Sequence, residues 1–122
     1  MITEVLGVFV RIVFGDLRRR AREYGIEKAQ CGAVTFVQTF GSALNCNVHL
    51  HMAVIDGVYA PKESGAPEFF PLRAPETSDV LNVVEAAARG VSGLLKRRGS
   101  RIQGAASSEL CLGRTHEESL GV

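Results

Sequence analysis

The chain has 122 residues and a mass of 13.1 kDa, which is the length of one small domain with a single core. Apolar residues make up 46% of it and charged residues 22%, a composition that excludes wholesale disorder. The 14 Lys and Arg residues almost balance the 13 Asp and Glu residues, and the net charge of +1 excludes an overall basic field. Any surface that binds nucleic acid is therefore expected to be local.

The cellular location is predicted from cysteines and from the N-terminal segment. The three cysteines are too few and too scattered for a disulfide scaffold, which favours a reducing cytoplasm. The N-terminus carries Glu4 and lacks a basic region and a cleavage site, so we expect no signal peptide. Arg11, Asp16 and the cluster Arg18–Arg20 interrupt the first apolar segment before it reaches membrane-spanning length. We expect a soluble, cytoplasmic protein with no membrane contact.

An amphipathic helix is predicted over residues 3–24. Apolar residues recur there at three- and four-residue spacings: Val5, Leu6, Phe9, Val10, Val13, Leu17 and Ala21. Gly25 is expected to end this helix in a left-handed conformation. Four arginines near its C-terminus suit the negative end of the helix dipole: Arg18, Arg19, Arg20 and Arg22.

Two strands are predicted inside an uncharged segment, residues 29–55. Residues 32–40 are rich in β-branched and aromatic side chains, and residues 47–55 alternate with a period of two. Residues 41–45 break both patterns and are expected to form a loop. The absence of charge indicates that these strands lie at the centre of a sheet.

A hairpin is predicted directly after the second strand. Asp56-Gly57 is the strongest hairpin signal in the chain, and Val58–Ala60 is expected to return from it. Residues 69–72 form a further short strand, in which Pro71 is expected at a sheet edge or a strand end.

A second helix is predicted over residues 77–98. Its cap region is Pro75–Ser78, Asp79 lies in its first turn, and a basic last turn precedes Gly99. Its apolar stripe consists of Val80, Val83, Val84, Ala87, Val91, Leu94 and Leu95. The predicted fold class is α+β, an antiparallel sheet with helices packed on one face, built from residues 1–102 and followed by a loose tail, residues 103–122.

The sequence His49-Leu50-His51 is the strongest candidate for chemistry. Two residues apart on a strand, the imidazoles project from one face with Cα atoms about 6–7 Å apart, so both can reach one metal ion. Gln38 on the preceding strand offers a neutral oxygen as a third ligand. The alternatives are two strand histidines with no ligand and an amide that bonds to backbone.

A structural zinc site is a rival interpretation of the same segment. Cys31, Cys46, His49 and His51 form a Cys/Cys/His/His set. Their spacing does not match a common zinc finger.

The segment GAVTFVQTFGSALNCNVHLHMAVIDGVY, residues 32–59, closely resembles the signature of two-tyrosine HUH transposases of rolling-circle insertion sequences. The resemblance lies in a strand with an aromatic residue and a glutamine, in the His-hydrophobic-His strand preceded by Asn, and in the Asp-Gly-Val-Tyr that follows. It extends less sharply over residues 5–99. From Gln103 onward we see none.

This resemblance implies a DNA transposition protein with an HUH-endonuclease (ferredoxin/RRM-like) core, incomplete in this chain. Such enzymes nick and join single-stranded DNA at transposon ends through a phosphotyrosine intermediate. By analogy, His49, His51 and a third polar ligand, Gln38, bind Mg²⁺ or Mn²⁺ and polarise the scissile phosphate. The expected partners are single-stranded DNA and other copies of the transposase.

Two basic clusters are the candidate phosphate contacts, which would make DNA binding steeply salt-dependent. They are Arg18, Arg19, Arg20 and Arg22 in the first helix, and Lys96, Arg97 and Arg98 in the second.

The chain departs from the family pattern in its tyrosines. The paired tyrosines of the family follow the second helix, whereas this chain has none after Tyr59. Tyr24 and Tyr59 do not match those positions, and Tyr59 is expected to be a structural ring. We therefore expect a truncated fragment, assign no catalytic residue, and predict no strand cleavage by the chain alone. An inactive remnant remains an alternative.

Overall fold

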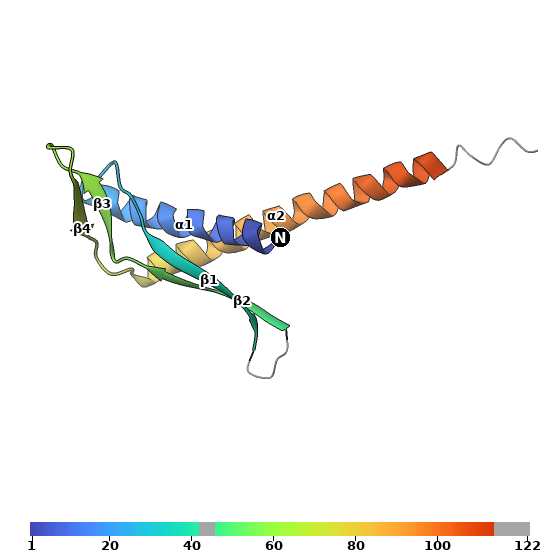
Figure 1. The fold of residues 1–122 in the computed structure, drawn as a ribbon, viewed down its shortest axis with the longest axis horizontal. Helices are drawn as coiled ribbons and strands as arrows, with labels where there is room; N and C mark the ends of the chain where they lie inside the picture. The colour runs from blue at the N-terminus through green and yellow to red at the C-terminus, as the bar shows by residue number, and fades with distance from the viewer. Residues whose placement is uncertain (42–45, 114–122) are drawn as a thin grey trace, which may run out of the picture.

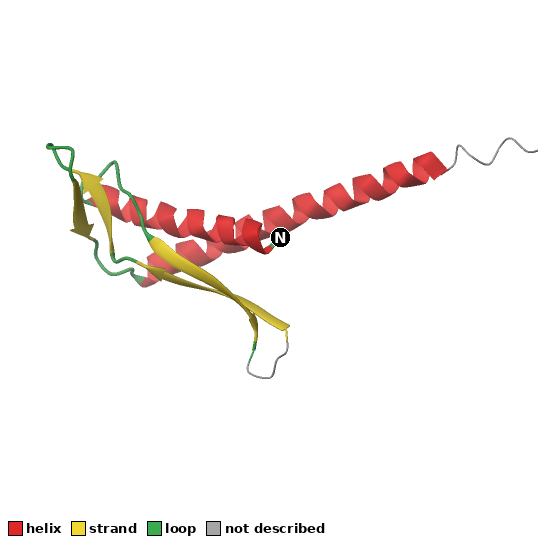
Figure 2. Ribbon diagram, viewed as in Figure 1, coloured by secondary structure: helices red, strands yellow, loops and turns green. Residues whose placement is uncertain are grey.

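The computed structural model describes residues 1–41 and 46–113, with side chains for residues 1–39, 41 and 48–101. Figures 1 and 2 show its helices and strands. In chain order these are α1 (Ile2–Glu23), β1 (Ala33–Phe40), β2 (Cys46–Val54), β3 (Gly57–Pro61), β4 (Pro67–Pro71) and α2 (Thr77–Gly113). The class is α+β, as predicted.

The end of α1 is set by Gly25, as its sequence predicts. Gly25 has a φ of 76°, which a residue with a side chain adopts only at a cost. The amide of Gly25 donates to the carbonyl of Arg22, and the amide of Ile26 donates to that of Ala21. These two hydrogen bonds form a Schellman motif and satisfy carbonyls at the helix end.

Strands β1 and β2 form an antiparallel ladder that follows the predicted alternation. Ala33 pairs with Val54 at one end, and the register continues to Gln38, which pairs with His49. The ladder is irregular between Gln38 and Phe40. Most of the predicted loop, residues 42–45, lies outside the described residues.

The predicted hairpin at Asp56-Gly57 is wrong. Strand β3 pairs with β4 and not with β2, so the described strands form two separate two-stranded sheets in place of the one expected sheet. A two-residue turn of the Asp-Gly type needs a positive φ at glycine, which Gly57 lacks. The amide of Leu72 instead donates to the carbonyl of Asp56, which draws the chain toward β4.

The true hairpin joins β3 to β4 through residues 62–66. Gly65 has a φ of 83° there, and its amide donates to the carbonyl of Lys62. Pro71 is the last residue of β4, which confirms its prediction at a strand end. A single bridge between Gln30 and Tyr59 joins this hairpin to the segment before β1.

Helix α2 begins as predicted but does not end at Gly99. It runs to Gly113 and includes residues 103–113, which were expected to be a loose tail. A glycine inside a helix costs only about 1 kcal/mol, and no proline follows to stop the helix. Residues 114–122 lie outside the described chain, and a domain boundary at residue 102 stays a prediction.

Helix α1 is the central element, because it packs against α2 and against β3. The core lies at its C-terminal half, where Leu17 and Ala21 pack with Ala29 and Val58. Figure 1 shows the second half of α2 extending beyond the rest of the fold. Within residues 1–41 and 46–113, neither helix combines the length and apolarity that a membrane crossing requires.

Candidate functional site

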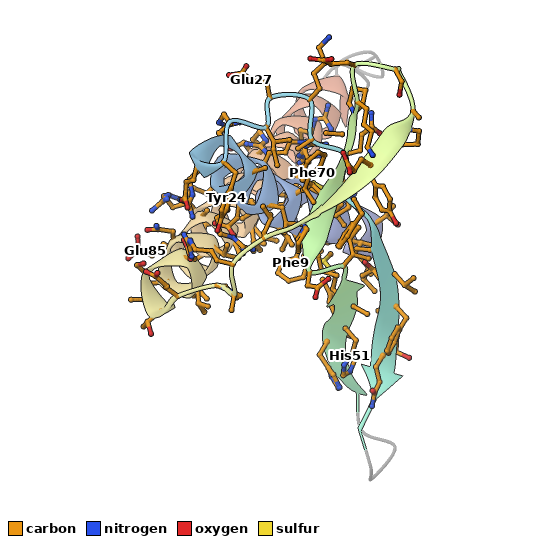
Figure 3. The ribbon with its side chains drawn as sticks, turned by 90° about the vertical axis from the view of Figure 1, so that its left-hand side faces the viewer. Phe9, Tyr24, Glu27, His51, Phe70 and Glu85 are labelled. Atoms are coloured by element: carbon orange, nitrogen blue, oxygen red, sulfur yellow. The ribbon has the colours of Figure 1, made fainter. Side chains whose placement is uncertain are left out.

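The β1–β2 ladder brings Gln38, His49 and His51 together on one face. Gln38 pairs with His49 across the ladder, and Phe36 pairs with His51. The Nε2 atom of His51 lies 3.2 Å from Oε1 of Gln38, and the two imidazole centroids lie 5.1 Å apart. Figure 3 shows His51 on the part of the strands that extends away from the helices. These three residues are those that the sequence singles out as metal ligands.

Phe36 fixes the orientation of His51. The two rings stack with centroids 5.0 Å apart and an interplanar angle of 12°. Gln38 and His51 are exposed and His49 is half-buried, so the face is open to a ligand of large size. Phe36 was not among the sequence candidates, because a phenylalanine cannot bind a metal ion and its contribution here is to stack on the imidazole of His51.

The donor set of this face consists of two imidazole nitrogens and one amide oxygen. Among the described residues, no group of three His, Cys, Asp or Glu side chains could hold a metal ion. We call the face that carries Gln38, His49 and His51 the histidine face. It supplies ligands without a negative charge of its own.

One distance on this face can be compared with the geometry of an octahedral divalent cation. With bonds of about 2.1 Å, two neighbouring ligand atoms of such an ion lie about 3.0 Å apart. The 3.2 Å between Nε2 of His51 and Oε1 of Gln38 is the length of a hydrogen bond, and it is also close to that value, so the two atoms could approach one cation with little movement. Imidazole and amide oxygen are both ligands that Mn²⁺ accepts, and Mg²⁺ prefers the oxygen.

Cys31 is not brought to the histidine face. It precedes β1, and its Sγ lies 3.8 Å from the carbonyl oxygen of Phe14. Burial raises the pKa of its thiol, which disfavours the thiolate that zinc requires. His51 pairs with Phe36, which lies five residues after Cys31. In an extended strand five residues span about 16 Å, so Cys31 is too far from His51 to share a metal ion with it. The side chain of Cys46 lies outside the described residues.

Two of the four arginines of α1 form ion pairs within the fold. Arg20 is 6% exposed, and its guanidinium donates to Asp16 at 2.9 Å and to the carbonyl of Arg73 at 2.7 Å. Arg19 donates to Asp16, and to Asp79 at the start of α2. Arg20 is therefore buried and bonded to Asp16 and to the backbone at Arg73, and DNA contact by Arg20 stays a prediction.

The other two arginines of α1 lie nearer the surface. The Nε atom of Arg18 donates to the carbonyl of Ala29 at 3.3 Å, and its guanidinium lies over the ring of Phe14. Arg22 is exposed. DNA contact by Arg18, Arg19 and Arg22 stays a prediction.

The basic residues of α2 line a hollow beside the start of α1. Its volume is 510 Å³, and Arg98 forms an ion pair there with Glu4 at 3.1 Å. The lining residues are Glu4, Leu94, Lys96, Arg97, Arg98, Ser100 and Arg101. Glu4 was not among the sequence candidates, because only the packing of α1 on α2 brings it here.

An apolar groove lies between the first turns of α1 and strand β2. It has a volume of 440 Å³ and is lined by Met1, Ile2, Val5, Phe9, Val48, His49 and Leu50. His49 thus lies at the border between the histidine face and the start of α1.

The comparison with known families decides which group of proteins this is. A family described as "Putative transposase" matches residues 32–117, which is about 70% of the chain. The chain belongs to this transposase family. No curated protein and no solved structure matches it.

The family match covers the histidine face of this transposase chain and the basic part of α2. It begins at residue 32, directly before β1, and ends at residue 117. The expectation that the resemblance ends before Gln103 is therefore wrong. Helix α1 lies outside the match, although it packs against the matched α2.

The two tyrosines of the transposase chain lie away from the histidine face. The ring of Tyr59 packs against Phe69 with centroids 5.2 Å apart, and its backbone pairs with Gln30. Tyr24 is the C-cap of α1 and is exposed. The ring contact of Tyr59 agrees with the structural role predicted for it.

Proposed function

We propose that this transposase-family chain binds Mg²⁺ or Mn²⁺ through His49, His51 and Gln38, and binds single-stranded DNA at a transposon end. The observation that carries the proposal is the placement of these three side chains on one face of the β1–β2 ladder, where Gln38 pairs with His49 and its oxygen lies within hydrogen-bond distance, 3.2 Å, of the His51 nitrogen. The membership in a transposase family supports a role in DNA transposition.

The charge of the site favours a phosphate as its ligand. The three proposed ligands carry no negative charge when the histidines are neutral, so a bound dication would keep most of its charge. A DNA phosphate supplies oxygen ligands and negative charge at once. The basic hollow beside Arg97 would hold a neighbouring phosphate of the same strand.

The finer assignment to the HUH type is part of this proposal. The resemblance of residues 32–59 and the antiparallel β1–β2 ladder that carries the histidines support it. When bound in such a site, the cation polarises the scissile phosphate. Cleavage would then need a tyrosine oxygen that bonds to phosphorus as the bond from phosphorus to the 3′ oxygen breaks, with the tyrosine proton passing to that leaving oxygen, which becomes a 3′ hydroxyl.

The chain's own residues would then bind and orient the DNA, and the nucleophile would come from elsewhere. The ring of Tyr59 packs on Phe69, and its backbone pairs with Gln30. His51 pairs with Phe36, which lies six residues after Gln30. Tyr59 and His51 are therefore paired with well-separated positions of the same segment. We therefore assign this chain the binding step.

Titration with Mn²⁺, followed by calorimetry and by electron paramagnetic resonance, tests the metal site. We expect one bound ion in the native chain, no binding in the variant His49→Ala/His51→Ala, and at least tenfold weaker binding in Gln38→Ala. His116→Ala is the matched control for removal of a histidine and should bind as the native chain does. Unchanged binding in the double variant would refute the site.

The same titration separates this site from the zinc alternative. The variant Cys31→Ser/Cys46→Ser should bind Mn²⁺ normally. Loss of binding in that variant, together with normal binding in Gln38→Ala, would show a Cys/Cys/His/His site. Fluorescence anisotropy of labelled single-stranded DNA, with and without Mn²⁺, then measures whether the bound ion contributes to DNA affinity.

A further inference from the structure

One side of α2 carries large apolar side chains that are about half exposed. Val80, Leu81, Val84 and Leu95 are 50%, 55%, 58% and 48% exposed. The exposed Ala88 and the half-buried Val91 lie between them. Spacings of three and four residues place these six side chains on one stripe of the helix, which we call the open stripe.

Helix α1 packs against a neighbouring side of α2. A Cβ atom on Gly90 would lie 2.6 Å from Cγ1 of Val8, so the two helices meet closely there. Leu94 is buried, and Arg98 forms the ion pair with Glu4. The four-residue spacing of 90, 94 and 98 continues along this second side, which leaves the open stripe beside it.

The edge of the open stripe that lies away from α1, which we call the free edge, carries two opposite charges. Glu85 and Arg89 are exposed and lie 3.6 Å apart at their closest charged atoms. A stripe that has an acidic and a basic residue along one edge, near the middle of its length, can pair with itself when the two copies run in opposite directions. Each copy then offers its acid to the partner's base.

We propose that the open stripe is the interface of a homodimer, in which α2 of one copy packs antiparallel on α2 of a second copy. A two-fold axis near Ala88 would place Val84 opposite the partner's Val91 and Val80 opposite the partner's Leu95. The same axis would place Glu85 opposite the partner's Arg89. A cluster of large apolar side chains exposed on one helix face is typical of an interaction surface.

The antiparallel direction follows from what borders the stripe. In antiparallel helix pairs, each edge of the stripe meets the same edge of the partner, so the Glu85 edges meet and both α1 helices stay outside. In a parallel pair, each edge meets the opposite edge. The α1 helix of the partner would then press on the Glu85 edge.

Sedimentation equilibrium of the full chain tests the dimer. Val84→Asp should raise the dissociation constant at least tenfold, because it buries a charge in the interface. Asn82→Asp adds the same charge to an exposed position outside the stripe and should leave the dissociation constant unchanged. A native chain that sediments as a monomer at about 200 μM, a weak limit for a specific dimer, would overturn the proposal.

A charge exchange tests the register. Glu85→Arg and Arg89→Glu should each weaken the dimer severalfold, since each places like charges opposite one another. The double variant should restore it. Circular dichroism shows whether the helix content is kept, and a double variant that stays as weak as the single variants would contradict the predicted pairing.

Cysteine cross-linking tests the direction. In a background with Cys31, Cys46 and Cys111 changed to Ser, Ala88→Cys lies at the axis and should form a disulfide-linked dimer. Val80→Cys should not, because the two positions would lie about 24 Å apart. A cross-link at position 80, with or without one at position 88, would show a parallel pair and refute the model.

Discussion

Arg73 donates two hydrogen bonds to Asp79, from Nη1 to Oδ2 at 2.5 Å and from Nη2 to Oδ1 at 3.3 Å. The carboxylate of Asp79 is almost fully buried, and it also accepts the amide of Glu76 at 2.8 Å. Arg73 donates in addition to Glu23 near the end of α1, and Arg19 of the same helix donates to Asp79. This cluster ties the end of α1 to the start of α2.

The cluster predicts a loss of stability in acid. The hydrogen bonds from Arg73, followed by the Glu76 amide, hold the pKa of Asp79 well below its usual range, and Arg73 lowers the pKa of Glu23. Because a lowered carboxyl pKa stabilises the fold only while the group is ionised, this contribution is complete above about pH 5 and is lost as the pH falls further. Thermal melts between pH 7 and pH 2 should show a falling midpoint for the native chain.

Removal of the Asp79 charge should remove much of that pH dependence. Asp79→Asn is expected to melt at a lower temperature at pH 7 and to show a flatter profile in acid. Glu76→Gln is the matched control, since that side chain is exposed and 3.9 Å from Arg73. Parallel pH profiles for the native chain and Asp79→Asn would contradict the role given to this carboxylate.

The close approach of the two helices predicts opposite effects at two glycines of α2. Gly90→Ala forces its Cβ against Val8, and overpacking of this kind costs about 1–3 kcal/mol. Gly99→Ala meets no atom within 4 Å and should gain about 1 kcal/mol from helix propensity. Urea denaturation measures both. Equal stabilisation by the two substitutions would mean that α1 and α2 do not meet at Gly90.

The left-handed end of α1 predicts a similar contrast. Gly25→Ala should destabilise the chain by about 1–2 kcal/mol, because alanine pays for a φ of 76°. Gly15→Ala, in an exposed and open position of the same helix, should stabilise it by about 1 kcal/mol. The comparison uses the free energies of unfolding, and a neutral Gly25→Ala would argue against the Schellman motif.

A carboxylate at position 38 should separate metal binding from DNA binding. Gln38→Glu keeps an oxygen near His51 and adds a negative charge, so we expect Mn²⁺ to bind about tenfold more tightly. The same charge should weaken DNA binding in the absence of metal. Gln30→Glu, on the segment that pairs with Tyr59, is the control for added charge alone. Weaker Mn²⁺ binding in Gln38→Glu would mean that Gln38 is not a ligand.

The basic residues should differ in their effect on DNA binding. Lys96→Ala and Arg97→Ala should each reduce the slope of log affinity against log salt by about 0.7, the value for one lost phosphate contact in single-stranded DNA. Arg20→Ala should instead lower the free energy of unfolding by about 2 kcal/mol, since it removes the hydrogen bonds from Arg20 to Asp16 and to the carbonyl of Arg73 while Arg19 stays paired with Asp16. A folded Arg20→Ala variant with a reduced salt slope would instead identify Arg20 as a DNA contact.

Local patterns in the sequence account for the parts that depend on neighbours in the chain. The alternation of residues 47–55 predicts a strand with both histidines on one face, and Gly25 predicts the end of α1 through its own conformational freedom. These features follow from the period of the backbone and from single residues. The family resemblance of the histidine motif is likewise local, and the family match confirms a transposase.

The tertiary structure decided everything that depends on a choice between partners. Asp56-Gly57 has the sequence of a hairpin turn, yet β3 pairs with the following strand β4, because the hydrogen bonds of that ladder outweigh a two-residue preference. Arginine is usually a surface residue, but the packing around α1 buries Arg20, which forms an internal ion pair with Asp16 and a hydrogen bond to the carbonyl of Arg73. Long-range packing also brings Glu4 beside Arg98, a contact that no periodicity encodes. A sequence determines which faces its segments offer, and only packing determines which of those faces are covered.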